Sequence, residues 1–237
     1  MMMEAGANAT SVNMIVQMLA RGLGAERVDL RIGYASLAIT VQIADAGVTQ
    51  MRTVGILGVD QRLAQGLWGL AKRAAKHEVD VEQSRAELVR LANQTPHHPG
   101  WIVAAAVGLG CVAFGRLLGV DWPGSGSVFL AASVGQYIRS MMLRWHVNPF
   151  LTTGLTSFIA SLLGGLGARL LGSATLIPAM IASILLPVPG VPAVNAQSDI
   201  LEGHPTLGSA RAVSVAMTLI FVAIGLWLGY ASLPGGR

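Results

Sequence analysis

The stretch ATLIPAMIASILLPVPGVPAVNAQSDILEG, residues 174–203, decides the fold, because it starts as an apolar run and continues with prolines, a glycine and polar side chains. Pro187, Pro189 and Pro192 lack an N–H, and each disfavours helix for the residue before it. A loop in water would be more polar, and an ordinary membrane helix would contain fewer prolines. We therefore expect a membrane segment whose helix is broken.

The composition around this stretch is that of a membrane protein. Of the 237 residues, 53% are hydrophobic and only 12% are charged, whereas average globular chains carry roughly 25% charged residues. Residues 1–100 hold ten Lys or Arg and nine Asp or Glu, while residues 101–237 hold six Arg and three acids. This asymmetry predicts a soluble α+β domain over 1–96 and a transmembrane helical domain over 97–237.

Apolar residues in the first domain recur with the period of a helix in some segments and with the period of a strand in others. Residues 10–24 have apolar positions at helical spacing, with Thr10 or Ser11 as the expected N-cap. Two further helices are expected after the caps Asp60 and Asp80. Between the first helix and these two, β-branched and alternating runs predict three strands of an antiparallel meander, at 27–33, 36–44 and 50–57.

The second domain is expected to cross the membrane about five times, because a span needs about 20 apolar residues. The second of these spans is the weakest, since Gln136 and Arg139 interrupt it. The expected spans lie near 101–119, 127–143, 149–172, 174–195 and 211–233.

Basic residues in the short loops predict the orientation. Arg139 and Arg144, in the second loop, and Arg211, in the fourth, are expected on the same side as the basic N-terminal domain. We therefore expect that domain in the cytoplasm and the C-terminus on the other side of the membrane. The net charge of +4 has the same topological explanation, so no nucleic-acid partner is predicted.

Polar residues within the apolar domain are the candidates for function, because charges inside a bilayer are costly. Asp199 follows the broken segment, and Asn195 precedes it by one helical turn. One alternative is an Asp that is simply solvated at the membrane edge. Likewise, Thr152 and Thr156 either line a polar pathway or bond the carbonyls of their own helix. The candidate substrate- or proton-binding residues are Asn195, Asp199, Pro189, Gly190, Thr152 and Thr156.

Catalytic signatures are weak. The chain contains no HExxH, GxSxG, P-loop or GxGxxG motif, and no nucleophile–base or metal-ligand set can be assembled from its residues. We therefore predict neither an enzyme nor a cofactor or metal site.

Two segments carry a family resemblance. MEAGANATSVNMIVQMLARGLG, residues 3–24, looks like the opening helix of the threonine/serine exporter family, although Asn13 and Met14 stand where that family has an acidic pair. The segment VPGVPAVNAQSDILEG, residues 188–203, is similar to the family's V-P-G-x-P-x-x-N-A-x-x-D-x-x-x-G. The chain resembles the larger subunit of the split, two-protein form of this family.

The resemblance implies a cytoplasmic N-terminal domain, five spans and a smaller membrane partner that supplies a second set. Family members export threonine and serine, and split relatives are linked to succinate. We therefore expect a subunit of a secondary exporter of small polar metabolites, working in the lipid bilayer with that partner or as a homo-oligomer. The alternative is a membrane-anchored cytoplasmic binding or sensor module that transports nothing.

Overall fold

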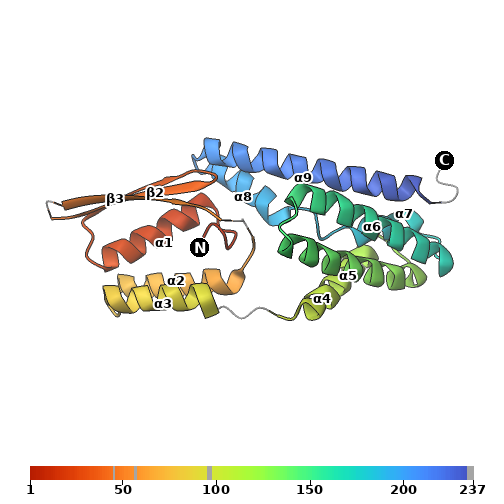
Figure 1. Cartoon of the computed structure of the whole chain (residues 1–237), viewed down its shortest axis with the longest axis horizontal. Helices are drawn as coiled ribbons and strands as arrows, with labels where there is room; N and C mark the ends of the chain where they lie inside the picture. Colours follow the sequence, from red (N-terminus) through yellow and green to blue (C-terminus); the bar gives the residue numbers. More distant parts are fainter. Residues whose placement is uncertain (45, 56–57, 95–97, 234–237) are drawn as a thin grey trace. The chain divides into compact units, whose positions relative to one another are not determined.

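The computed structural model describes residues 1–44, 46–55, 58–94 and 98–233, which form two compact units (Figure 1). The first unit consists of Met1–Pro96 and Gly190–Val213, and the second of His97–Pro189 and Ser214–Arg237. The first unit therefore contains two separate parts of the chain, and so does the second. The last helix begins in the first unit and ends in the second. We refer to them as the N-terminal unit and the helical unit.

The N-terminal unit is built in layers. A three-stranded sheet packs on α1, and α1 packs on α2, which contacts α3 (Figure 1). Its elements are α1 (Ala9–Gly22), β1 (Arg27–Ile32), β2 (Ser36–Ile43), β3 (Ala46–Thr53), α2 (Gln61–Ala75), α3 (Val81–Gln94), α8 (Gly190–Leu201) and the start of α9 (Pro205–Ala231).

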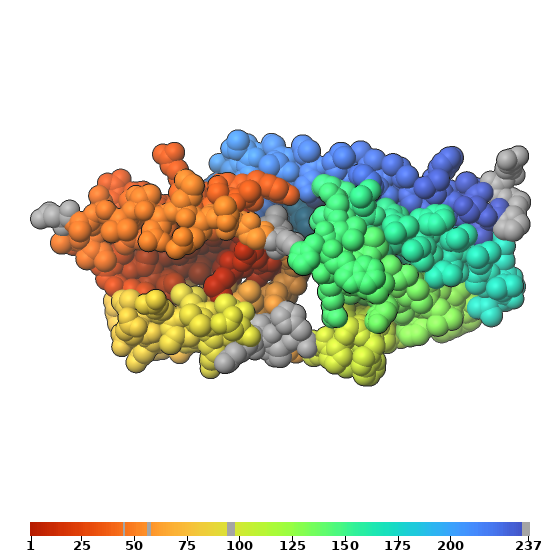
Figure 2. Space-filling model, viewed as in Figure 1, coloured from red at the N-terminus to blue at the C-terminus, as the bar shows by residue number. Residues whose placement is uncertain are grey.

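The sheet is the predicted antiparallel meander, in the order β1-β2-β3. The third strand begins at Ala46, four residues before the predicted start, because Ile43 pairs with Ala46 across a tight hairpin. Every residue of β3 is exposed, so this strand has no buried face that would mark its limits in the sequence. Figure 2 shows the β2–β3 hairpin in orange at the surface of its unit. The predicted strand end at 56–57 lies outside the described residues.

The core of this unit forms between α1 and α2, where Val12 and Ile15 pack with Leu67 and Ala71. Helical spacing predicted these apolar faces. The predicted N-cap of α1 is wrong, because the cap is Asn8, whose side chain accepts a hydrogen bond from the Ser11 N–H.

The two other predicted caps are confirmed. Asp60 accepts a hydrogen bond from the Leu63 N–H, and Asp80 accepts one from the Gln83 N–H. Each carboxylate satisfies a backbone donor that has no partner within the first helical turn.

The helical unit consists of closely packed helices in which α5 contacts α4, α6 and α7 (Figure 1). Small residues allow this approach. At Gly135 of α5, an added Cβ would lie 3.1 Å from the Cβ of Ala160 in α6. The helices of this unit are α4 (Gly100–Leu117), α5 (Trp122–Arg144), α6 (Pro149–Leu170), α7 (Leu176–Ser183) and the remainder of α9.

Three of the described helices, α4, α6 and α9, are long and apolar enough to cross a membrane. They correspond to the first, third and fifth predicted spans. The fourth predicted span, 174–195, is not one continuous helix, in agreement with the predicted break: α7 ends at Ser183 and α8 begins at Gly190. The second predicted span lies within α5, which is long enough to cross a membrane but is less apolar than these three helices. The total of five spans stays a prediction.

Candidate functional site

The helix break predicted from the prolines lies between α7 and α8, at residues 184–189. Pro187 has no N–H to donate to the carbonyl of Ser183, so the helix cannot continue. The chain turns instead, with the Val188 N–H donating to the Leu185 carbonyl over 3.1 Å. Pro192 does not contribute to the break, because it lies in the first turn of α8, where a missing N–H costs nothing.

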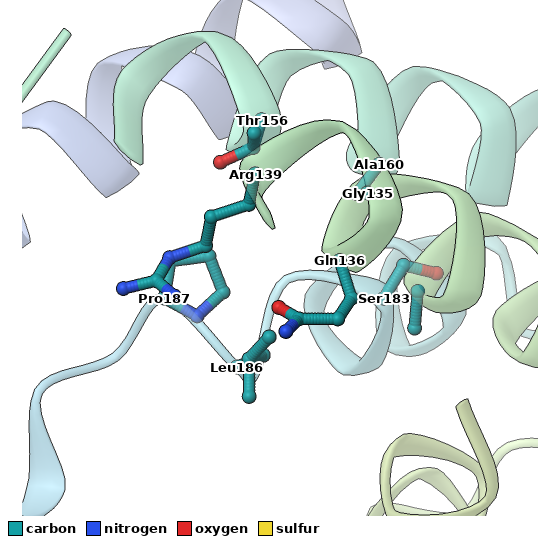
Figure 3. A pocket seen from close by; sticks show the side chains of 9 residues that line it. Gly135, Gln136, Arg139, Thr156, Ala160, Ser183, Leu186 and Pro187 are labelled. Atoms are coloured by element: carbon teal, nitrogen blue, oxygen red, sulfur yellow. The ribbon is translucent and has the colours of Figure 1, made fainter. Parts of the chain in front are cut away.

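A small pocket lies beside this break, within the helical unit (Figure 3). Its empty space measures about 220 Å³, part of which is open solvent. Its walls are Ala132, Gly135, Gln136 and Arg139 of α5, Thr156 and Ala160 of α6, Ser183 of α7, and Leu186 and Pro187 of the break.

Gln136 and Arg139 supply the polar wall of the pocket. They lie three residues apart on α5, which places them on one helical face, and Figure 3 shows both side chains extending toward Leu186 and Pro187. Gln136 is only 9% exposed and donates through Nε2 to Ser140 Oγ over 3.3 Å. Its Oε1 and the Nε of Arg139 are buried and have no hydrogen-bond partner among the described residues.

Sequence reasoning missed this pair as a site. Arg139 falls within the predicted span 127–143, but we used it with the second loop as a marker of the cytoplasmic side; in the structure it lies within α5, which continues to Arg144. The sequence did contain a signal for this site, because Gln136 and Arg139 are the two residues that interrupt the predicted span 127–143. An ionisable side chain inside such a stretch is by default a functional candidate.

Hydroxyl groups of α6 and α7 complete the polar part of the pocket. Thr156 Oγ1 donates to the Thr152 carbonyl over 2.7 Å, and Ser183 Oγ donates to the Ala179 carbonyl over 2.8 Å. Bonding of Thr156 within its own helix was one of the two expected alternatives, but each hydroxyl oxygen can still accept a hydrogen bond. Thr152 is fully buried, its Oγ1 has no partner among the described residues, and it does not line the pocket.

Asn195 and Asp199 lie in the N-terminal unit rather than in the helical unit. They project from one face of α8, as predicted, toward the segment before α1. The Nδ2 of Asn195 donates to the Gly6 carbonyl over 2.8 Å. Asp199 is fully buried: its Oδ1 accepts from the Ala9 N–H over 2.7 Å, and its Oδ2 pairs with Arg211.

The structure therefore does not bring the six candidates of the sequence into one site. Thr156 lines the pocket, and Thr152 lies one turn away on the same helix. Pro189 is the last residue of the helical unit and Gly190 the first residue of α8. In the helical unit, Thr156 lies in the same pocket as Gln136 and Arg139. We consider this pocket the candidate site for a ligand.

Comparison with known proteins gives consistent results over the whole chain. The model of the family described as "Putative threonine/serine exporter" matches residues 1–233. The chain is 29% identical over 233 residues to a protein of Escherichia coli strain K12 named "Probable succinate transporter subunit YjjP", covering 95% of this chain and 90% of that protein. The protein of the same name from Klebsiella aerogenes is 28% identical over 229 residues, covering 95% and 87%. No solved structure matches.

Proposed function

We propose that this chain, which belongs to the threonine/serine exporter family, is a subunit of a secondary exporter whose cargo binds in the pocket of the helical unit. The cargo is a small polar metabolite, either an amino acid of the threonine/serine type or a dicarboxylate such as succinate. The observation that carries the proposal is the polar wall of Gln136 and Arg139 in a pocket whose other lining residues are neutral.

The position of the pocket supports transport more than anchoring. Many secondary transporters bind substrate at discontinuous helices, where backbone groups released from the helix can contact polar cargo. Here Leu186 and Pro187, which belong to the break, form one wall of the pocket. A segment that only anchors a soluble domain needs neither a broken helix nor buried polar atoms without partners.

We further propose that the exporter needs a second set of helices. Many secondary transporters combine two structural repeats, and this chain supplies one set. The word "subunit" in the names of both relatives supports a partner. That partner is a smaller membrane protein or a second copy of the chain. The N-terminal unit lies in the cytoplasm, and the helices cross the bacterial inner membrane.

The experiment is a flux measurement in cells that lack their own copy of the gene, so that any partner subunit stays present. Cells carrying the wild-type chain on a plasmid are loaded with labelled succinate, threonine or serine, and the release of each label is followed. Faster release of at least one label than in cells with the empty plasmid supports the proposal. Equal release of all three with and without the chain contradicts it and favours the membrane-anchored sensor.

The role predicted from sequence for Asn195 and Asp199, contact with cargo or a proton, is tested in the same cells. Asp199→Asn and Asn195→Ala are compared with the wild-type chain at equal amounts in the membrane. If both variants export at the wild-type rate, neither side chain binds cargo or protons. Point variants are preferable to deletion of residues 1–95, because Ala7 and Ala9 are partners of the buried Asp199–Arg211 pair.

A further inference from the structure

We infer that the pocket binds the carboxylate of a small anionic substrate that has no ammonium group, with Arg139 as its counter-charge. This inference rests on the proposed function and selects between its two classes of cargo. It favours dicarboxylates and other small organic acids over zwitterionic hydroxy amino acids.

Arg139 has no counter-ion among the residues that the structure describes. In the sequence of the helical unit, Asp121 is the single acidic residue. It lies 18 positions before Arg139, about 27 Å along a helix at 1.5 Å per residue. Its carboxylate is also occupied, because it accepts from Ser173 Oγ and from the N–H groups of Gly124 and Ala174.

Two other arginines, Arg116 near the end of α4 and Arg144 at the end of α5, need no acid. The guanidinium of Arg116 donates to the Val120 carbonyl and lies 4.4 Å from the centre of the Trp122 ring. Arg144 is exposed at the end of α5. Arg139 differs from both, because its Nε is buried beside the pocket and has no hydrogen-bond partner among the described residues. The side chain as a whole is half-buried. A partly buried charge without a counter-ion is costly, and an anion in the pocket would compensate it.

The geometry of a guanidinium selects the kind of anion. Its planar array of N–H groups matches the two oxygens of a carboxylate, with which it forms paired charge-assisted hydrogen bonds. Gln136 lies one turn away on the same face and lines the same pocket. Because its amide has both a donor and an acceptor end, it can bind a second oxygen of the substrate, ionised or protonated.

The charge balance of the pocket disfavours an ammonium group. A zwitterionic amino acid is neutral overall, so it would leave the charge of Arg139 uncompensated. Its ammonium would also lie near a guanidinium, with only neutral acceptors available from Gln136, Thr156 and Ser183. A substrate with negative net charge meets neither difficulty.

The test uses the full chain, purified from its host together with any subunit that remains bound, and reconstituted into vesicles. The measurement is exchange of labelled succinate and labelled threonine, with Arg139→Gln as the variant and Arg144→Gln, on the same helix, as the matched control. We expect Arg139→Gln to slow succinate exchange by about 10- to 100-fold, the effect of losing a charge-assisted hydrogen bond. We expect Arg144→Gln to exchange succinate within about twofold of the wild-type rate.

A second measurement separates loss of succinate binding from misfolding of the Arg139→Gln variant. Succinate should raise the melting temperature of the wild type and of Arg144→Gln but not of Arg139→Gln, because only a protein that binds the ligand is stabilised by it. Arg139→Lys, which keeps the charge but loses the planar donor array, should exchange succinate faster than Arg139→Gln.

The inference is overturned if Arg139→Gln exchanges succinate at the wild-type rate, or if the wild-type protein exchanges threonine as fast as succinate. In both cases the proposed function survives, because the chain still transports. If the wild-type protein exchanges neither succinate nor threonine nor serine, the proposed function fails and the inference fails with it.

Discussion

The Oδ2 atom of Asp199 lies 2.5 Å from Nη1 of Arg211, and the two side chains are 0% and 5% exposed. The same two side chains bind the first residue of α1 and the segment before it. Asp199 accepts from the Ala9 N–H, and Arg211 donates to the Ala7 carbonyl over 3.1 Å. An ion pair between α8 and α9 therefore holds residues 7–9 in place, and all of these residues belong to the N-terminal unit.

The first prediction concerns this ion pair. Replacing Asp199 with Ala leaves Arg211 buried without a counter-charge and the Ala9 N–H without an acceptor. We expect a loss of about 3–5 kcal/mol in the free energy of unfolding, which is typical when one partner of a buried pair is removed. The measurement is unfolding of the purified chain in detergent. The double variant with Arg211→Ala should lose less than the sum of the two single losses; simple additivity would show that the pair is not coupled.

The second prediction separates the observed N-cap of α1 from the predicted one. Asn8→Ala removes the acceptor of the Ser11 N–H, which lies 3.0 Å from Asn8 Oδ1. It should lower the free energy of unfolding by about 0.5–2 kcal/mol. Thr10→Ala, two residues inside the helix, is the control and should change it by less than about 0.5 kcal/mol. A larger loss of stability for Thr10→Ala than for Asn8→Ala would support Thr10 as the N-cap, as expected from sequence.

The third prediction concerns the packing of α9 against α6. An added Cβ at Gly225 would lie 2.4 Å from the carbonyl oxygen of Gly154 and 2.8 Å from the Phe158 nitrogen, both backbone atoms that a rotamer change cannot move. Gly225→Ala should therefore cost about 1–3 kcal/mol of stability, seen as a lower melting temperature in detergent.

Gly110 on α4 is the matched control, because an added Cβ there has nothing within 4 Å. Gly110→Ala should leave stability unchanged or raise it by up to about 1 kcal/mol, since Ala favours helix over Gly. Equal melting temperatures for the two variants would show that α6 and α9 do not need close contact.

The fourth prediction concerns pH. Hydrogen bonds from Ser173 first of all, and from the Gly124 and Ala174 N–H groups, lower the pKa of Asp121 from 3.8 to about 2. A carboxyl group whose pKa is lowered by folding stabilises the folded state above its unfolded pKa, and this stabilisation is lost as the pH falls through the folded pKa. The stability advantage of wild type over Asp121→Asn should therefore be constant above about pH 5 and shrink between about pH 4 and pH 2.

Unfolding of both proteins in detergent across this pH range provides the measurement. An advantage that persists unchanged at pH 2 would show that the carboxylate charge contributes nothing and that only the cap geometry matters.

Local signals in the sequence predicted much of the fold. Helical spacing of apolar residues placed α1, α2 and α3, and the prolines predicted the break between α7 and α8. Local signals failed where the deciding contact comes from elsewhere in the chain. The start of β3 is set by pairing with β2, and α3 exposes Val81 and Val89, which are apolar.

The candidate site shows the same division. For Thr156 the sequence left two alternatives, a polar pathway or a bond within its own helix; in the structure it makes that bond and also lines the pocket. Arg139 was used as a marker of the cytoplasmic side, because a basic residue near the end of an apolar run is a common marker of that side. Only the packing of α5 against α6 and the break reveals that its Nε is buried beside a pocket and has no partner in the described part of the chain.

By itself, the sequence determined the class of the protein, the helical and strand segments with clear periodicity, the break at the prolines and the family. These features depend on composition and on residues close together along the chain. Only the tertiary structure decided which partners the polar residues have: Asp199 pairs with Arg211 and binds Ala9, while Arg139 faces a pocket with no acid. The physical reason is that the cost of a buried charge depends on atoms that folding brings close, and spacing along the chain does not specify them.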